Sequence, residues 1–203
     1  GISQKTIDQA LPADLTVNEK TLRLDKKQPE GRITFQKYKQ NTLNKARIDK
    51  GRKMMRKYHK ELAQVSKKYG VQPQYIVALW GMETNYGGYT GGFDVPRALA
   101  SLAYDGRRAD FFYGELIKAL QIIDAGHIRA DQMKGSWAGA MGQSQFMPSS
   151  FLRYAVDENG DGKTDIWQTE LDVFASAANY LKTVGWAGDE RWGRLVQLPD
   201  GFD

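Results

Sequence analysis

Glu83 stands at the end of an apolar stretch of the sequence, where a carboxyl group has the surroundings of a general acid. Residues 75–82 are mostly apolar or aromatic, and the glycine-rich residues 84–94 follow. Apolar surroundings disfavour the charged form of a carboxyl group and raise its pKa, and the negative end of a helix acts in the same direction. A carboxylic acid that is still protonated near neutral pH can donate its proton to a leaving group. The pattern also fits a Glu83 that only caps a helix or pairs with an arginine.

A second acidic group lies in residues 157–163, whose sequence is DENGDGK. Ca²⁺ binds about six to eight oxygens, and an EF-hand loop supplies them from side chains at positions 1, 3 and 5 and from the backbone carbonyl at position 7. Asp157, Asn159 and Asp161 stand at the three side-chain positions, and Lys163 stands at the carbonyl position. The pattern therefore predicts a calcium loop, and its alternative is a solvated turn that binds no metal.

The end of this loop departs from the EF-hand pattern. Position 12 is normally a glutamate that binds calcium with both oxygens, and Gln168 occupies it here. Either the site is weak, or a carboxylate further along the chain completes the shell, namely Glu170 or Asp172. Calcium at such a site fits the millimolar concentrations found outside the cytosol.

The composition excludes several classes of site. The chain of 203 residues is 41% hydrophobic and contains no cysteine and two histidines. The absence of cysteine excludes disulfides, thiolate metal sites and cysteine nucleophiles. Two histidines leave little room for a zinc site or a Ser-His-Asp triad. No run of about 18 apolar residues is present, the length that predicts a membrane-spanning helix.

The net charge is +5, and lysines and arginines concentrate in residues 37–68. A basic stretch of this kind fits a nucleic-acid surface, the solvated face of a helix, or a surface that attracts an anionic cell-wall polymer or lipid. Because no nucleic-acid-binding motif accompanies the stretch, we expect no nucleic-acid partner.

The spacing of apolar residues predicts a mainly α-helical protein. Residues 33–69 form a helical region that ends at Gly70, and Pro73 begins an almost entirely apolar helix that reaches Glu83. Further helices are predicted over residues 96–104, 108–125, 148–155 and 170–184. Strands are expected only as short pieces near the calcium loop. Gly70 marks the predicted domain boundary.

Residues 135–147 are rich in small side chains, which at helical spacing favour close packing. The segment also carries three side chains with hydrogen-bonding groups that could line a sugar cleft, Ser136, Gln143 and Gln145. The adjacent arginines at 107 and 108 either begin a helix or bind a carboxylate on a substrate.

Several separate motifs make the chain resemble the membrane-bound lytic murein transglycosylase B family over most of residues 30–190. They are ETNYG at 83–87, the arginines at 107–108, GSWAGAMGQSQFMPSS at 135–150, the Asp/Asn loop, and ANY at 178–180. The resemblance implies a lysozyme-like helical core with an EF-hand-like calcium loop, packed against an N-terminal helical domain. Residues 1–70 would form that N-terminal domain, and residues 71–203 the catalytic core. Because the family pattern continues with a C-terminal segment that closes one side of the cleft, we expect a fragment or a shortened member.

The resemblance also implies roles for particular residues. Glu83 matches the single catalytic acid and base of the family. Ser136 and Gln145 match residues that hold sugar acetamido and hydroxyl groups, Tyr38 and Tyr180 match aromatics that line the cleft, and Arg107 and Arg108 match residues near the peptide-bearing side. The implied calcium ligands are Asp157, Asn159, Asp161, the Lys163 carbonyl and Asp172, with Glu170 as the alternative to Asp172. The calcium would be structural.

The activity implied is cleavage of the β-1,4 bond between N-acetylmuramic acid and N-acetylglucosamine in peptidoglycan, which leaves 1,6-anhydromuramic ends. We therefore expect peptidoglycan glycan strands as the partner and a monomer in the bacterial periplasm or at the outer membrane. A membrane anchor would belong to a segment outside this chain. The alternative function is that of a non-catalytic, calcium-stabilised fragment that binds peptidoglycan.

Overall fold

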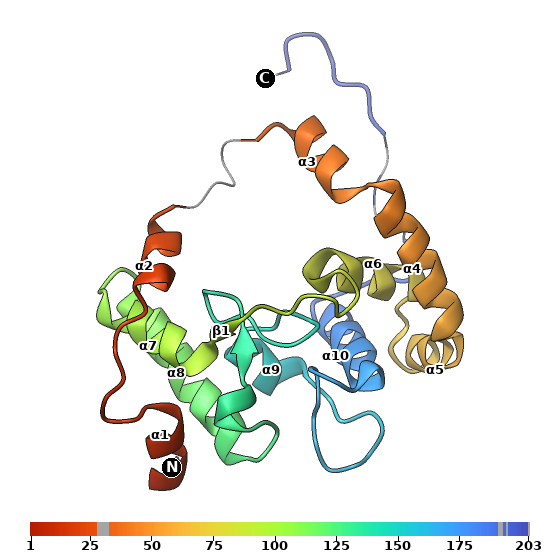
Figure 1. Ribbon diagram of the computed structural model, residues 1–203. Coiled ribbons are helices and arrows are strands. Elements are labelled where there is room, and N and C mark those ends of the chain that lie inside the picture. The colour runs from red at the N-terminus through yellow and green to blue at the C-terminus, as the bar shows by residue number, and fades with distance from the viewer. Residues whose placement is uncertain (28–32, 191–192, 194, 203) are drawn as a thin grey trace.

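The computed structural model of the protein describes residues 1–27, 33–190, 193 and 195–202. Helices dominate this part of the chain, as the sequence predicts (Figure 1). The helices are α1 (Gln4–Ala10), α2 (Glu19–Lys26), α3 (Phe35–Thr42), α4 (Lys45–Lys57), α5 (His59–Tyr69), α6 (Pro73–Thr84), α7 (Val95–Tyr104), α8 (Ala109–Asp124), α9 (Pro148–Tyr154) and α10 (Glu170–Thr183), with the short 3₁₀ helix η2 (Ala130–Gln132). None of the helices in the described ranges has the length and apolar character needed to cross a membrane.

The two short strands lie where the sequence did not predict them. β1 (Phe93–Asp94) pairs antiparallel with β2 (Lys134–Gly135), so that Phe93 is opposite Gly135. Strands were expected near the calcium loop, and that prediction is wrong for the described residues. Two-residue strands have no alternating pattern to detect, because they form only where two distant segments meet.

The predicted helical region 33–69 consists of three helices rather than one. Asn44 caps α4 by accepting a hydrogen bond from the backbone N–H of Arg47 at 2.9 Å, and such a cap starts a new helix. Tyr58 separates α4 from α5. Gly70 ends α5 in the left-handed conformation with φ of 75°, as the sequence predicts.

Buried side chains of the described residues form one hydrophobic cluster at the centre of the molecule. Leu62 and Val65 of α5 are buried in the same cluster as Ile76 of α6, Leu120 of α8 and Phe174 of α10. Helix α5 therefore packs into the core on which the site is built. The division of the chain at residue 70 stays a prediction.

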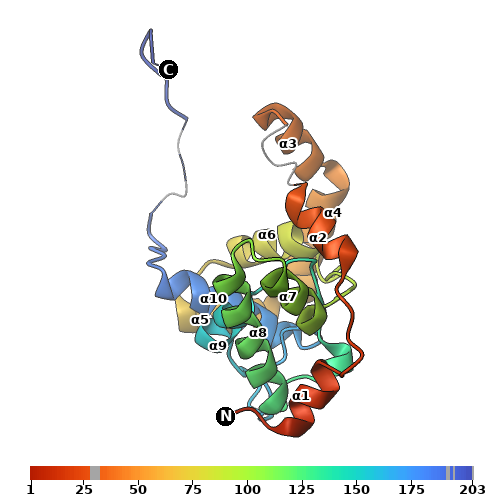
Figure 2. The same cartoon turned by 90° about the vertical axis from the view of Figure 1, so that its left-hand side faces the viewer.

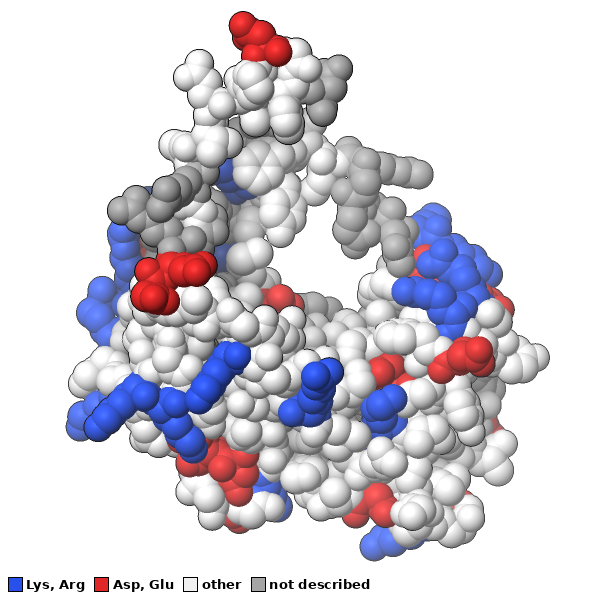
Figure 3. Space-filling view, turned by 180° about the vertical axis from the view of Figure 1, so that it is seen from behind, with Lys and Arg blue, Asp and Glu red and all other residues white. Residues whose placement is uncertain are grey.

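The outer helices differ in how firmly they pack. Helix α1 lies against α8, and α2 lies against α7, whereas α3 has no buried residue. Figures 1 and 2 show α3 and residues 195–202 projecting from the body, at the end of the molecule opposite the N-terminus. The space-filling view from behind shows an open space between this upper part and the body (Figure 3).

Candidate active site

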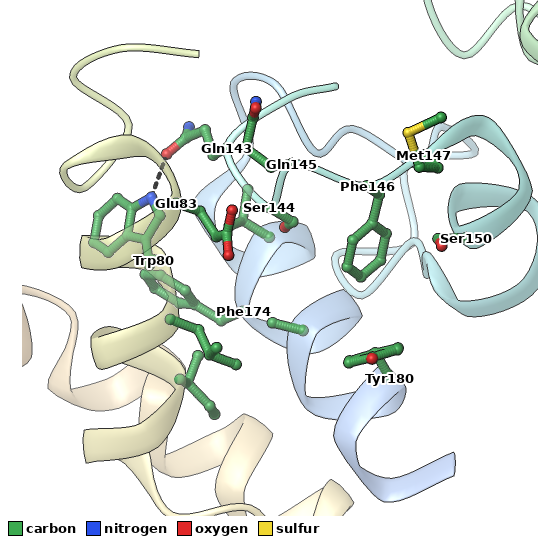
Figure 4. Close-up of a pocket in the computed structure, with 14 residues that line it drawn as sticks. Trp80, Glu83, Gln143, Ser144, Gln145, Phe146, Met147, Ser150, Phe174 and Tyr180 are labelled. Carbon is green, nitrogen blue, oxygen red and sulfur yellow. Dashed lines mark hydrogen bonds between the residues drawn. The ribbon is translucent and has the colours of Figure 1, made fainter. Parts of the chain in front are cut away.

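A pocket of about 230 Å³ lies among α6, residues 143–147, α9 and α10. Its walls are mainly apolar and aromatic, and Figure 4 shows the side chains that surround it. The lining residues are Ile76, Leu79, Trp80, Glu83, Gln143, Ser144, Gln145, Phe146, Met147, Ser150, Val173, Phe174, Ala177 and Tyr180. Among these residues Glu83 is the only acid, so the pocket presents one carboxyl group to a ligand.

The Glu83 carboxyl group has no protein partner in the described part of the chain, either as a hydrogen bond or as an ion pair. Its side chain stays open to solvent on the pocket side, and burial against the pocket walls raises the pKa of the group above its ordinary value. Neither alternative from the sequence, a helix-capping role or an arginine pair, is seen among these contacts. The arrangement suits a carboxylic acid that donates a proton.

Asp94, the acidic residue in the glycine-rich loop, does not join Glu83 in the pocket. Its carboxylate accepts a hydrogen bond from the backbone N–H of Arg97 at 3.0 Å. The same carboxylate forms an ion pair with Lys134, whose Nζ lies 3.2 Å from Asp94 Oδ2. Glycosidases with two catalytic carboxylates place them about 5–10 Å apart around the scissile bond. The described residues offer no such second carboxylate in this pocket.

The backbone after Glu83 is unusual. Asn85 and Tyr86 have φ of 52° and 61°, in the left-handed region; asparagine adopts it readily as a helix C-cap, whereas it costs a residue such as Tyr86 about 1–3 kcal/mol. The Thr84 hydroxyl group supports the turn, because it donates to the Gln143 carbonyl at 2.9 Å and accepts from the Gly87 N–H at 3.1 Å. The end of α6 is thus fixed from the far side of the pocket.

Gln143 joins the two walls of the pocket. Its side-chain oxygen accepts a hydrogen bond from Trp80 Nε1 at 2.8 Å (Figure 4), and its side-chain nitrogen donates to the Trp167 carbonyl at 3.0 Å. A Cβ atom at Gly87 would lie 2.3 Å from the same amide oxygen, so only glycine fits there. Gln143 is buried, and these contacts make it a cross-link within the wall.

Two of the predicted substrate-binding residues line the pocket. Gln145 has a φ of 50°, and its side-chain nitrogen donates to the carbonyls of Thr90 and Gly142, both at 3.0 Å. Tyr180 lies with its ring centre 6.0 Å from that of Phe146 and forms part of the aromatic wall. These positions suit an amide contact and an aromatic surface for a sugar ring.

The two predicted arginines lie away from Glu83, with their guanidinium groups bound to a protein carboxylate. Arg107 Nε is 2.8 Å from Asp25 Oδ2, and Arg108 Nη2 is 2.9 Å from Asp25 Oδ1. Burial acts to raise the pKa of Asp25, but the hydrogen bonds from both arginines outweigh it and lower that pKa. The pair fastens α2 to the start of α8.

Ser136 and Tyr38 also lie outside the pocket. The Ser136 hydroxyl group accepts hydrogen bonds from the backbone N–H groups of Ala138 and Ala140, at 3.3 and 3.0 Å, and so closes a turn. Tyr38 is an exposed residue of α3. Contact with substrate stays a prediction for Ser136 and Tyr38, as it does for the two arginines.

Several residues of the walls were not predicted from the sequence, chiefly Trp80, Phe146 and Phe174. They look like ordinary core residues in the sequence, and only packing reveals that they face a pocket. Ser144 was also missed. Its hydroxyl group is buried and has no hydrogen-bond partner among the described residues.

The predicted calcium loop is a turn stabilised by its own acidic side chains. The Asp157 carboxylate accepts hydrogen bonds from the N–H groups of Gly160 at 2.7 Å and Gly162 at 2.8 Å. Asp161 accepts from the Lys163 N–H at 2.9 Å and from the Asn159 side chain at 3.0 Å. The side chains of the described residues contain no group of three Asp, Glu, His or Cys placed to hold a metal.

Asp172 provides a test of whether the loop fits a cation. It is completely buried, and its two oxygens accept from the N–H groups of Glu158 and Asp165, both at 2.9 Å. Burial raises the pKa of Asp172, and the Asp157 charge adds to that effect. None of the ion pairs formed by the described residues includes either aspartate. Asp172 is thus a buried carboxylate that feels the charge of the partly buried Asp157, and the carboxylate and amide oxygens of the loop are the donor type that calcium prefers.

Residues 1–203 match the family described as "Transglycosylase SLT domain". The chain belongs to this family. The SLT domain matches membrane-bound lytic murein transglycosylase B of Escherichia coli (strain K12) with 37% identity over 172 residues, which are 82% of this chain and 47% of that protein. The chain thus spans about half the length of the curated relative it matches.

Solved structures of other proteins share the fold of this SLT domain. SltB3 from Pseudomonas aeruginosa, in complex with NAG-NAM-pentapeptide, has a TM-score of 0.94 and 43% identity over 100% of this chain and 54% of its own. SltB1 from the same organism has a TM-score of 0.83 and 38% identity over 88% of this chain and 60% of its own. Escherichia coli Slt35, in complex with calcium, has a TM-score of 0.80 and 34% identity over 88% of this chain and 57% of its own. These likenesses confirm the predicted lysozyme-like helical fold.

Proposed function

We propose that the SLT domain is a peptidoglycan lytic transglycosylase in which Glu83 acts first as acid and then as base. The observation that supports this proposal best is the solitary carboxyl group of Glu83, which lines the pocket without a hydrogen-bond or ion-pair partner in the described ranges. Because its pKa is raised, the group holds its proton to a higher pH than an ordinary glutamate and can release it to a bound substrate.

The reaction needs one protein carboxyl group because the substrate supplies the nucleophile. Glu83 protonates the oxygen of the β-1,4 bond between N-acetylmuramic acid and N-acetylglucosamine, and the bond from C1 to that oxygen breaks. The 2-acetamido oxygen of the muramic sugar stabilises the positive charge at C1. The Glu83 carboxylate then takes the proton of the C6 hydroxyl group as the C6 oxygen bonds to C1. The 1,6-anhydro ring forms without consumption of water, and intramolecular attack favours it.

The relatives support the substrate class. SltB3 has been solved with NAG-NAM-pentapeptide and with NAG-anhNAM-pentapeptide. The name of the second ligand includes an anhydro sugar. This SLT domain has 43% identity to SltB3. A pocket with an amide, an aromatic wall and one acid suits sugars that carry N-acetyl groups.

Calcium would stabilise the fold rather than take part in the chemistry. The residues that would hold it are Asp157, Asn159, Asp161, the Lys163 carbonyl and Asp172, none of which lines the pocket of Glu83. When bound, the ion would neutralise the buried Asp172 and the loop carboxylates of Asp157 and Asp161, and would fix the loop. Slt35 has been solved in complex with calcium, which supports this assignment.

We further propose that the protein acts on glycan strands as a monomer facing the cell wall, in the periplasm or at the outer membrane, with any membrane anchor outside residues 1–203. Nucleic acid is not a proposed partner. The names of the relatives, which refer to murein and to its fragments, support the wall as the site of action.

Mass spectrometry of digested murein sacculi tests this function. The proposal predicts soluble muropeptides whose muramic ends are one water, about 18 Da, lighter than hydrolytic products, since no water is consumed. Ordinary reducing ends would show a hydrolase instead. Sacculus binding with no released product would favour the alternative, a non-catalytic fragment that binds peptidoglycan.

A further inference from the structure

The ring of Tyr86 fills the space between helices α4 and α6. Gly51 is the only residue of α4 described as buried, and a Cβ atom there would lie 2.6 Å from the Tyr86 hydroxyl oxygen. A Cβ atom at Gly81 of α6 would lie 2.6 Å from the Tyr86 ring. Trp80 packs edge-on against the same ring, at 5.6 Å between ring centres. The ring therefore touches the backbones of both helices, and glycine is required on each side.

Two polar contacts from α4 reach the same turn. The Tyr86 hydroxyl group donates to the Arg47 carbonyl at 2.7 Å, and Lys50 Nζ donates to the Asn85 carbonyl at 2.7 Å. The contacting positions 47, 50 and 51 are three and four residues apart, so they share one face of α4. This face holds Asn85 and Tyr86 in the left-handed backbone that follows Glu83.

The position of the Glu83 carboxyl group depends on this turn. With no hydrogen bond or ion pair to the described residues, the side chain is placed only by the last turn of α6 and by the pocket walls. We propose that Tyr86 is a positioning residue for Glu83 and that Gly51 and Lys50 of α4 complete a clamp around it. Helix α4 thereby takes part in catalysis, although none of its residues lines the pocket.

This inference rests on the proposed function of Glu83 and extends it to a helix that the sequence places before Gly70. The competing explanation is that Gly51, Lys50 and Tyr86 only hold two helices together. The two explanations predict different activities for variants that are equally stable. A clamp alters the chemical step and the proton affinity of Glu83, whereas simple helix packing alters only the fraction of folded protein.

The test uses Tyr86→Phe, which removes one hydrogen bond and keeps the ring, and Gly51→Ala, which displaces the ring. Lys50→Met removes the second polar contact. The control is Met55→Ala, since Met55 is a partly buried residue of α4 that packs on the core. Thermal melting of each variant gives the folded fraction, and murein turnover is measured over a range of pH at a temperature where all are folded.

The clamp predicts that kcat falls on the order of tenfold in Tyr86→Phe and up to about 100-fold in Gly51→Ala, with KM almost unchanged, because small displacements of a catalytic group are costly. The pH at which the rate falls on the alkaline side should also move. The Met55→Ala control should keep the kcat and pH profile of the wild type. Equal kcat values and pH profiles in all four variants would overturn the clamp.

A second readout does not depend on turnover. Carbon-13 NMR of the Glu83 carboxyl group gives its titration midpoint in the wild type and in each variant. The clamp predicts a displaced midpoint in Tyr86→Phe and Gly51→Ala and an unchanged one in Met55→Ala. If the wild type releases no product from murein, the proposed function fails, and this titration still decides the clamp. Identical midpoints in folded variants would refute it.

Discussion

Glu83 and Asp161 carry the same chemical group and are held in opposite ways. The Glu83 carboxyl group has no partner in the described structure, and burial raises its pKa. The Asp161 carboxylate accepts hydrogen bonds from the Asn159 side chain and the Lys163 N–H, which lower its pKa. A partly buried carboxyl group without donors holds its proton to a higher pH and suits proton transfer, whereas one that accepts hydrogen bonds stays ionised to a lower pH, as a metal ligand must. The local contacts, rather than the residue type, separate a proposed acid from a proposed metal ligand.

The largest effect is expected for Glu83→Gln. The amide has nearly the same shape but cannot donate and then accept the proton, so murein turnover should fall by at least about 1000-fold. Asp94→Asn is the control, because Asp94 lies in the neighbouring loop but outside the pocket. Release of soluble muropeptides measures the loss. Turnover near the wild-type level in Glu83→Gln would remove the acid from the mechanism.

The second variant tests the wall that shields Glu83. Gln143→Leu removes the acceptor of Trp80 Nε1 and the donor to the Trp167 carbonyl, and each buried group left unpaired costs about 1–3 kcal/mol. We expect about 2–4 kcal/mol of lost stability in urea unfolding, together with reduced turnover. Ser144→Ala is the matched control, since its buried hydroxyl group has no partner to lose among the described residues, and it should change stability by less than about 1 kcal/mol. A Gln143→Leu protein as stable as Ser144→Ala would show that the cross-link is not needed.

Added calcium tests the proposed metal ligand Asp161 and its loop. At a concentration of about 100 times Kd, calcium should stabilise the protein by about 2.7 kcal/mol. In a domain of this size that corresponds to a rise in Tm of roughly 5–10 °C. Asp161→Asn should lose most of this rise, whereas Glu83→Gln should keep it. Metal-stripped protein whose Tm stays constant in millimolar calcium would leave residues 157–163 as a plain turn.

The smallest expected effect concerns pH and stability. Because the pKa of Glu83 is higher in the folded than in the unfolded protein, the folded state binds the proton more tightly. Its contribution to stability is therefore fully present below the unfolded pKa and is lost as pH rises through the folded pKa. The Glu83→Gln variant cannot titrate at this position, so it does not lose this stability as pH rises. Its free energy of unfolding relative to the wild type should therefore increase from pH 4 to pH 8. The increase should be less than about 1 kcal/mol, because solvent reaches the carboxyl group. Urea unfolding at the two pH values measures the difference, and a relative stability that is constant or decreases would contradict it.

Local patterns in the sequence predicted much of the fold and part of the site. Gly70 and Pro73 mark helix boundaries through backbone geometry alone, and the structure confirms both. Glu83 could be chosen because some of the apolar residues that line its pocket, Ile76, Leu79 and Trp80, are also its neighbours in the chain. In these cases the physical cause acts within one helix or one turn, which a single sequence can reveal.

Contacts between distant segments could not be predicted in this way. Trp80 and Gln143 are 63 positions apart, and Arg107 is 82 positions from Asp25. The arginines seemed available for a substrate because nothing in the sequence shows that α2 brings Asp25 beside them. The proposed role of Tyr86 could not be predicted for the same reason, because it depends on contacts with Gly51 of α4 and Gly81 of α6.

Carbon-13 NMR titration of the Glu83 carboxyl group in the wild-type protein tests whether this residue can act as the acid. The account predicts a single midpoint clearly above that of an ordinary glutamate, because the group lies against the pocket walls without donors. A midpoint at or below the ordinary value would mean that Glu83 is hydrated or bound to donors, and it would contradict the assignment of Glu83 as the acid.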